Sequence, residues 1–264
     1  MTSTEPGHYS LTKKQRTILN LLYRFRFATS DLLSKTTGIS KKTINKRLQL
    51  MMKREYIGRR FEPEYHLLRK HAAYYLLPEG QKALRKISTT KYNPAALRNT
   101  NKDPDAKEPF VNHWLTVFRA HCVLKELYGD SLQFFTKSQL AGSKILPKKL
   151  PDAYVQLEAE DDQKRFLFDV FHEDQPFFLA TRRVMQYIDY AENGDWPSKY
   201  EFPPVLLVCD STSLQRRLLK KMRHAIGNAD NDELRFFITT TDELKDDAWQ
   251  NMADPEETLS LSSM

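Results

Sequence analysis

The spacing of apolar residues between positions 12 and 55 most constrains what this chain can fold into. Apolar residues recur at helical spacing in three runs, at 13–25, 30–38 and 41–55. The second run ends at Gly38, a residue type that favours the left-handed conformation just beyond a helix. Each run follows a residue that commonly caps helix N-termini, namely Thr12, Thr29 or Ser30, and Ser40. A helix, a short helix, a tight turn and a third helix are the order of a helix-turn-helix.

The third predicted helix combines an apolar stripe with polar and cationic faces. Ile44, Leu48 and Met51 lie four and three residues apart, so they are expected to face the core. The polar residues expected to face the major groove of DNA are Lys41, Lys42, Thr43, Asn45, Lys46 and Arg47. Asn45 is the main candidate for reading a base, because its amide can donate and accept hydrogen bonds together.

The segment after this helix predicts a wing. Residues 56–61 form one expected strand, residues 72–77 form a return strand, and Pro78 opens a further helix. Cations that flank this hairpin and are expected to contact phosphates are Arg59, Arg60, Arg69, Lys70 and His71. Residues 1–88 therefore predict a winged helix-turn-helix domain that binds double-stranded DNA. The alternative is a winged helix that contacts protein and carries its charges as a solvated face.

Charge is segregated along the chain. Residues 1–107 contain 23 Lys and Arg against 8 Asp and Glu, a net charge of +15, whereas residues 108–229 contain 16 of each. Residues 230–264 contain 2 basic and 10 acidic residues, a net charge of −8. A domain this basic attracts polyanions, because each phosphate that it neutralises releases condensed counterions. We expect an acidic flexible tail over 251–264, which either solubilises the chain or competes with DNA for the basic domain.

Composition excludes several classes of protein. No apolar run approaches the ~18–20 residues that cross a bilayer, and the N-terminus lacks the pattern of a signal peptide. We therefore expect a cytoplasmic protein with no membrane partner. Cys122 and Cys209 stand in apolar contexts, which predicts reduced core thiols. The chain has no phosphate-binding glycine motif and no structural zinc spacing.

Beyond a predicted linker at 89–109, residues 110–250 predict an α/β domain. A long helix near its start is followed by strand patterns, by helices near 176–192 and 211–227, and by a closing helix over 241–252. The apolar run PPVLLVCD predicts a buried strand between the helices near 176–192 and 211–227. His113 and His121 lie eight residues apart on the first helix. A metal pair is one interpretation, but histidines at the edge of the core are favoured, because no carboxylate or thiol stands at ligand spacing.

Several motifs carry a resemblance to a known family. They are the entry LT..Q..IL.LL..FRFATS..L, the exit L..M...YI.RR, and the segments YYLLPEG, LPDAYVQL, RFLFDVF and RRVMQYIDY. Together they resemble the replication-relaxation family of plasmid and mobile-element proteins over residues 11–242. The resemblance implies a winged helix followed by a restriction-endonuclease-like mixed-sheet domain, related to mobilisation relaxases. It also implies a role in replication, mobilisation or transcriptional control, with a homodimer and replication or mobilisation proteins as partners.

The resemblance further implies where a nuclease site would lie. Asp152 and Asp169 match the two acidic positions that would hold Mg²⁺, but Phe171 stands where active relatives carry a lysine. Phenylalanine cannot stabilise developing negative charge. Residues that could still supply a cation or a further carboxylate are Arg182, Arg183, Lys164, Glu158 and Glu173. We favour a degenerate core that needs no cofactor; the alternative is a metal-dependent DNA-nicking endonuclease or relaxase.

Overall fold

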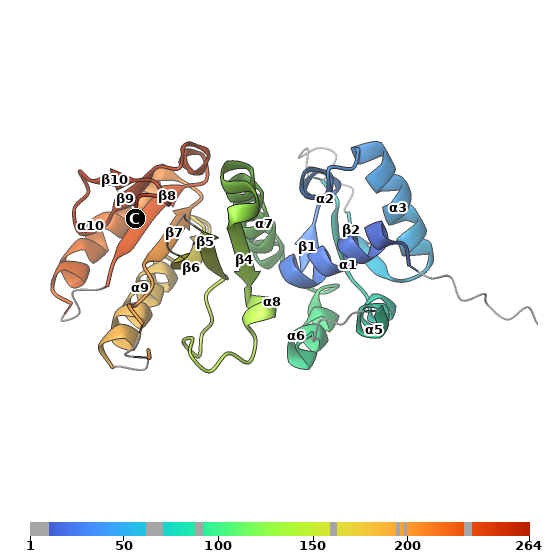
Figure 1. Cartoon of the computed structure of the whole chain (residues 1–264), viewed down its shortest axis with the longest axis horizontal. Coiled ribbons are helices and arrows are strands. Elements are labelled where there is room, and N and C mark those ends of the chain that lie inside the picture. Colours follow the sequence, from blue (N-terminus) through green and yellow to red (C-terminus); the bar gives the residue numbers. More distant parts are fainter. Residues whose placement is uncertain are drawn as a thin grey trace, which may run out of the picture. The chain divides into compact units, whose positions relative to one another are not determined.

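The chain forms two compact units, which we describe separately (Figure 1). The first contains Met1–Lys91 and Thr100–Pro104, and the second contains Tyr92–Asn99 and Asp105–Met264. The computed structural model describes residues 11–61, 71–87, 92–158, 163–193, 196–197, 200–229 and 234–264. The predicted linker at 89–109 is not one continuous irregular segment, because residues 94–99 and 100–102 form short helices that belong to the two units.

The first unit combines helices with a small antiparallel sheet of order β1-β3-β2. Its helices are α1 (Lys13–Phe25), α2 (Ser30–Thr37), α3 (Lys41–Lys53), α5 (Pro78–Ile87) and the 3₁₀ turn η1 (Thr100–Lys102). Its strands are β1 (Phe27–Ala28), β2 (Ile57–Arg60) and β3 (Ala73–Leu76). The three predicted helices and the two predicted hairpin strands are therefore confirmed, and β1 is an additional strand.

Capping residues explain where the first helices begin and end. Thr12 and Gln15 form a capping box at the start of α1, and the Thr29 hydroxyl accepts from the Leu32 N–H at the start of α2. Gly38 ends α2 in the left-handed conformation, with φ of 66°. Ser40 stands at the N-cap of α3, but its hydroxyl pairs with that of Thr43 at 2.9 Å and not with a backbone N–H.

The second unit is built on a seven-stranded mixed sheet of order β10-β9-β8-β7-β6-β5-β4. Strands β6, β7 and β8 are parallel, and the other neighbouring pairs are antiparallel. The strands are β4 (Leu132–Thr136), β5 (Ala153–Glu158), β6 (Gln163–Phe171), β7 (Val205–Cys209), β8 (Phe236–Thr240), β9 (Trp249–Asn251) and β10 (Thr258–Leu259). The predicted combination of α and β structure is confirmed.

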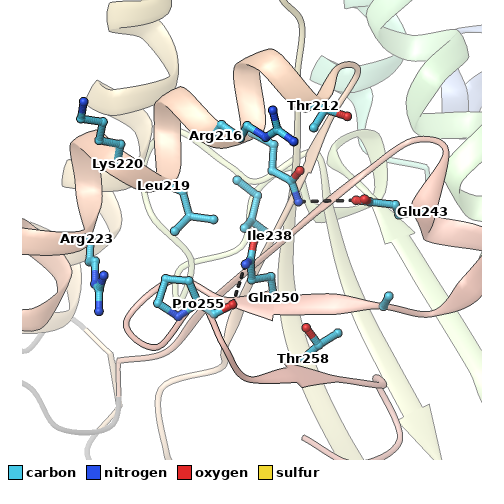
Figure 2. A pocket seen from close by; sticks show the side chains of 12 residues that line it. Thr212, Arg216, Leu219, Lys220, Arg223, Ile238, Glu243, Gln250, Pro255 and Thr258 are labelled. Carbon is cyan, nitrogen blue, oxygen red and sulfur yellow. Dashed lines mark hydrogen bonds between the residues drawn. The ribbon is translucent and has the colours of Figure 1, made fainter.

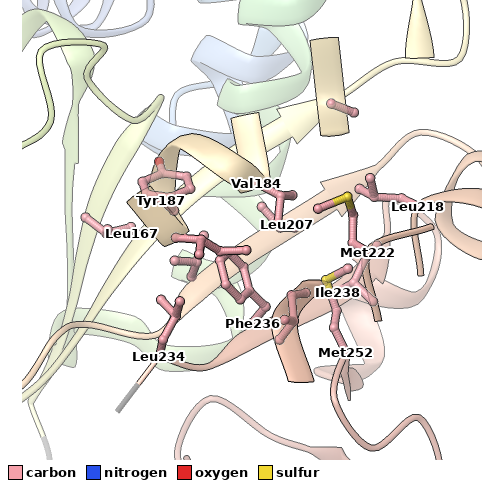
Figure 3. Close-up of a cluster of buried hydrophobic side chains, with 14 of the residues drawn as sticks. Leu167, Val184, Tyr187, Leu207, Leu218, Met222, Leu234, Phe236, Ile238 and Met252 are labelled. Atoms are coloured by element: carbon pink, nitrogen blue, oxygen red, sulfur yellow. The ribbon is translucent and has the colours of Figure 1, made fainter. Parts of the chain in front are cut away.

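Helices cover both faces of this sheet. On one face, α9 and α10 pack over Leu167, Leu207 and Ile238 (Figure 3). On the other, His121 of α7 contacts the ring of Phe134, which in turn contacts Phe168. The helical elements of the unit are α6 (Pro94–Asn99), α7 (Glu108–Tyr128), η2 (Gly129–Ser131), α8 (Lys137–Leu140), α9 (Phe177–Glu192), α10 (Thr212–Gly227) and η3 (Glu243–Asp246). Successive residues of β6 alternate between the two faces, so each face receives its own set of side chains.

The C-terminal segment differs from its prediction. A closing helix was expected over 241–252 and a flexible tail over 251–264, but η3, β9 and β10 occupy this region. Trp249, Met252 and Leu261 are fully buried, and these three apolar anchors attach the segment to the sheet. Within the predicted tail, the acidic residues Asp254, Glu256 and Glu257 lie in the turn between β9 and β10.

The two cysteines and the lengths of the helices can also be compared with their predictions. Cys122 and Cys209 are both buried and free, as predicted, and burial raises the pKa of the Cys209 thiol to about 12. None of the helices within the described residues is long and apolar enough to cross a membrane.

Candidate nucleic-acid interface and buried acidic cluster

Helix α3 of the first unit presents two opposite faces. Ile44, Leu48 and Met51 are fully buried, as their spacing predicted. On the opposite side, Lys42, Lys46, Gln49 and Lys53 are all exposed. These four residues are spaced four, three and four apart, so they form one stripe along the helix, which we call the α3 stripe. Gln49 and Lys53 were not among the predicted contact residues, although the helical period of the buried residues places them on this face.

The other predicted residues of α3 are less free to contact a ligand. The Lys41 ammonium lies 2.6 Å from the Asp31 carboxylate of α2, so it ties the two helices together. Thr43 pairs with Ser40, and Asn45 is half-buried on the flank of the α3 stripe. Arg47 is also half-buried, and its Nη1 atom has no hydrogen-bond partner among the described residues.

The predicted wing cations differ in their surroundings. Arg60 donates from Nη1 to the carbonyl oxygen of Pro104 at 2.6 Å, so it holds the unit together. Arg59 is exposed, and its guanidinium lies 5.0 Å from the centre of the Phe61 ring. His71 lies 3.4 Å from Asp31. Arg69 and Lys70 lie outside the described residues.

In the second unit, Asp152 and Asp169 meet at the junction of β5 and β6. The Asp152 N–H donates to Asp169 Oδ1 at 3.0 Å, and the Val170 N–H donates to Asp152 Oδ2 at 3.1 Å. Both carboxyl groups are buried. The expectation that these two residues come together is thus consistent with their geometry. Of their side-chain partners, Arg183 was among the candidate cations, whereas Tyr187 and His113 were not expected at this site.

Helix α9 supplies the partners of Asp169. Arg183 donates from Nε to Asp169 Oδ2 at 2.7 Å, and the Tyr187 hydroxyl donates to the same oxygen at 2.6 Å. Arg183 also donates to the Lys149 carbonyl oxygen at 2.6 Å. Burial lowers the pKa of Arg183, but the Asp169 carboxylate outweighs burial and raises it overall. Burial, reinforced by Asp169, raises the pKa of Tyr187 well above its ordinary value.

Helix α7 supplies the partner of Asp152. His113 Nε2 lies 3.0 Å from Asp152 Oδ1. Burial opposes ionisation of both groups, but their mutual attraction outweighs it, so the pKa of His113 is raised and that of Asp152 is lowered to about 2. The imidazole is thus a core-edge histidine that neutralises a carboxylate, and it does not pair with His121.

A second histidine adjoins this pair. The His172 ring lies edge-on to that of His113, with 5.4 Å between centroids, and its Nδ1 atom lies 3.1 Å from Asp210 Oδ2. Burial lowers the pKa of His172, and the positive charge of His113 lowers it further. Neither His172 nor Asp210 was predicted from the sequence, since the two residues lie 38 positions apart and share no motif.

The acidic cluster does not fit a divalent metal ion. All four carboxylate oxygens of Asp152 and Asp169 face protein donors, and a metal would have to displace a buried guanidinium or imidazole. Within the described ranges, no group of three or more His, Cys, Asp or Glu could hold a metal. Phe171, which stands where the family resemblance implies a lysine in active relatives, lies in the hydrophobic core with residues of α9.

The other candidates for this site lie away from the two acids. Arg182 is exposed, and its neighbour Arg183 is the cation that reaches Asp169. Lys164 donates to the Ser262 carbonyl oxygen, and Glu158 accepts from the Gln133 amide. Glu173 is exposed, and hydrogen bonds from Ser211 and Ser213 lower its pKa.

One protein-family model matches this sequence over most of its length. The model described as replication-relaxation matches residues 19–206, which span most of the chain. The chain belongs to the replication-relaxation family. The matched range covers parts of both units, since it contains α3 of the first unit and Asp152 and Asp169 of the second. Among curated proteins, no match was found.

Solved structures offer a weaker comparison. The restriction endonuclease FokI matches with 11% sequence identity and a TM-score of 0.34, covering 89% of this chain and 43% of the FokI chain. FokI bound to DNA matches with 11% identity and a TM-score of 0.31, covering 93% and 45%. This chain therefore spans less than half the length of FokI, and similarity at this level does not establish a common fold.

Proposed function

We propose that this protein binds double-stranded DNA through its first unit and acts as a non-cleaving DNA-binding protein. We interpret the first unit as a winged helix-turn-helix, in which α2 and α3 flank the turn at Gly38 and β2 and β3 form the wing hairpin. In this class of domain the second helix of the motif enters the major groove.

The main support for DNA binding by the first unit is the α3 stripe. Lys42, Lys46 and Lys53 place three exposed cations along the helix face opposite the core, and Gln49 lies among them as a hydrogen-bonding side chain. The cations would neutralise phosphates, and the amide could address a base edge. The net charge of +15 over residues 1–107 supports a polyanionic ligand.

We further propose that the second unit is a nuclease-like domain that does not cut DNA. Arg183 and Tyr187 engage Asp169, His113 engages Asp152, and Phe171 fills the position of a catalytic lysine. Membership of the replication-relaxation family supports action in replication, mobilisation or transcriptional control of a plasmid or other mobile element. A sequence-specific target, cytoplasmic location and homodimerisation are parts of the same proposal.

DNA binding is tested by measuring affinity for duplex DNA across a salt series. The double variant Lys42→Gln/Lys46→Gln should reduce the slope of log K against log salt by about 2 units, because each phosphate contact contributes about 0.9. The control Arg85→Gln/Lys86→Gln removes the same charge from exposed positions of α5 and should change the slope less. Equal effects of the two variants would show that only overall charge matters and would refute a role for α3.

Sequence specificity is tested with Asn45→Ala. The target is first identified by sequencing the DNA fragments that co-purify with the protein. Loss of a bidentate contact should cost about 1–3 kcal/mol at the target site and much less on unrelated DNA. If Asn45→Ala weakens binding to all sequences equally, Asn45 does not read a base, and Gln49 becomes the residue to substitute.

Cleavage is tested by a nicking assay on supercoiled DNA with Mg²⁺ or Mn²⁺. We expect no nicking above background, since both carboxylates are already engaged by protein donors. Metal-dependent nicking that disappears in Asp152→Ala would establish an active nuclease and overturn this part of the proposal.

A further inference from the structure

A groove of about 590 Å³ lies in the second unit, between α10 and the strands at one end of the sheet (Figure 2). Arg216, Lys220 and Arg223 of α10 form one wall. The facing wall contains Gln250 of β9 and Thr258 of β10. The groove is separate from the acidic cluster and plays no part in the proposed action of the first unit.

The helix wall is strongly cationic. Helix α10 contains five Lys and Arg and no Asp or Glu, although residues 108–229 as a whole are neutral. Arg216, Lys220 and Arg223 are spaced four and three apart, so they project from one side of the helix, and all three are exposed. Within the part of the chain that the structure describes, none of the three pairs with a carboxylate.

The acidic side chain in the described lining is already engaged. Glu243 Oε2 accepts from the Thr240 hydroxyl at 3.0 Å. It also lies 3.5 Å from the Gln215 amide nitrogen, and the dashed line at Glu243 in Figure 2 marks this second contact. Together the two contacts hold the carboxylate near the end of the groove. On the facing wall, Gln250 donates to the Pro255 carbonyl oxygen at 2.6 Å. The positive potential of α10 is thus not cancelled by an ion pair across the groove.

The spacing of the cations fits a phosphodiester chain. Seven residues of helix separate Arg216 from Arg223, a rise of about 10 Å. If α10 runs along the axis of a duplex, where phosphates of one strand rise by about 3.4 Å per nucleotide, this wall matches about three such steps. No aromatic side chain belongs to the described lining, so the groove offers charge to a backbone and no platform for stacking bases.

We propose that this groove is a second DNA-binding surface, in which Arg216, Lys220 and Arg223 contact phosphates of one strand. The inference rests on the proposed function as a DNA-binding protein. The strand is recognised through its phosphates, so it belongs either to a duplex or to single-stranded DNA. An acidic protein segment is the competing occupant, but the regular run of cations on one helix and the basic first unit favour a nucleic acid.

Two adjacent lysines provide a matched test. Lys220 lines the groove, whereas Lys221 is equally exposed but projects about 100° further round the helix and is not part of the lining. Lys220→Gln and Lys221→Gln therefore remove the same charge from the same helix. The full chain is titrated into labelled duplex and single-stranded DNA of about 40 nucleotides per strand, between about 50 and 200 mM salt.

We expect the triple variant Arg216→Gln/Lys220→Gln/Arg223→Gln to reduce the slope of log K against log salt by about 2–3 units. Lys220→Gln should reduce it by about 0.7–0.9, and Lys221→Gln should leave it unchanged. A change seen only with the duplex assigns the groove to duplex DNA, and a change seen only with the single strand assigns it to that form. Unaltered thermal unfolding of each variant shows that the fold is intact.

The inference is overturned if the folded triple variant keeps the wild-type slope on both DNAs, or if Lys220→Gln and Lys221→Gln act equally. It is also overturned if polyglutamate binding is lost in the triple variant while DNA binding is unchanged, because an acidic protein then occupies the groove. If Lys42→Gln/Lys46→Gln still weakens DNA binding in these cases, only the groove proposal fails. If the wild-type chain binds neither DNA, the proposed function fails with it.

Discussion

Arg183 donates from Nε to Asp169 Oδ2 at 2.7 Å, and the two side chains are only 3% and 7% exposed. A carboxylate at this depth needs a compensating charge, since an isolated ion in the interior loses several kcal/mol of hydration. The guanidinium from α9 provides it, and Tyr187 donates to the same oxygen. The charge of Asp169 is thus neutralised by a cation from within the protein.

Removing this cation should destabilise the second unit. Arg183→Ala leaves Asp169 buried and unpaired, so we expect the free energy of unfolding to fall by about 3–5 kcal/mol in urea denaturation. Arg182→Ala, at the adjacent exposed position, is the control and should stay within about 0.5 kcal/mol of the wild type. A loss below about 1 kcal/mol for Arg183→Ala would show that the ion pair does not support the fold.

The pair formed by His113 and Asp152 should give stability that depends on pH. The pKa of His113 is raised above its ordinary 6.5, so its contribution is complete below pH 6.5 and is lost as pH rises through the folded-state value. The pKa of Asp152 is lowered from 3.8, so its contribution is present above pH 3.8 and is lost as pH falls towards 2. The pair should therefore stabilise the fold most between these limits.

His113→Gln tests this dependence, because glutamine keeps a donor but carries no charge. We expect the variant to lose about 1.5–3 kcal/mol at pH 5 and much less at pH 8, measured by urea unfolding. The same comparison in a His172→Gln background excludes a contribution from the neighbouring imidazole. A deficit that grows as pH rises would contradict the proposed ion pair.

Arg59 and Arg60 should respond differently to substitution, although they are adjacent in β2. Arg59→Ala should lower the salt slope of DNA binding by about 1 unit and leave stability nearly unchanged, since its side chain is exposed. Arg60→Ala should lower stability by about 1–3 kcal/mol, because the Pro104 carbonyl oxygen loses its donor. The salt series and thermal unfolding of both variants provide the check, and the reverse pattern would refute the assignment.

Gly80 should not tolerate a side chain. A Cβ atom there would lie 2.2 Å from the backbone oxygen of Tyr56, so the start of α5 would have to move away from the segment before β2. We expect Gly80→Ala to cost about 1–3 kcal/mol of stability. The control Gly227→Ala, at the end of α10, has open space around it and should be neutral or slightly stabilising. Thermal unfolding distinguishes the two, and equal stability of both variants would contradict the close approach.

The sequence pattern alone predicted those helices and strands whose formation depends mainly on their own residues. The helical period placed α1, α2 and α3, and the apolar run PPVLLVCD became β7, which is fully buried. Capping residues located the helix ends to within one or two residues. The C-terminal strands were missed, because β9 and β10 are short, lie among acidic residues and depend on pairing in which β9 joins β8 and β10 joins β9. Charge suggested a flexible tail, but buried Trp249 and Leu261 decided otherwise.

The sequence by itself determined the segregation of charge and the buried and exposed faces of α3, and its family motifs singled out Asp152 and Asp169. Only the tertiary structure decided what those acids do. Helices α7 and α9 pack on opposite faces of the sheet and bring His113 to Asp152 and Arg183 to Asp169. Local spacing fixes the face of an element on which a side chain lies, but the partner of a buried charge depends on which distant element covers that face.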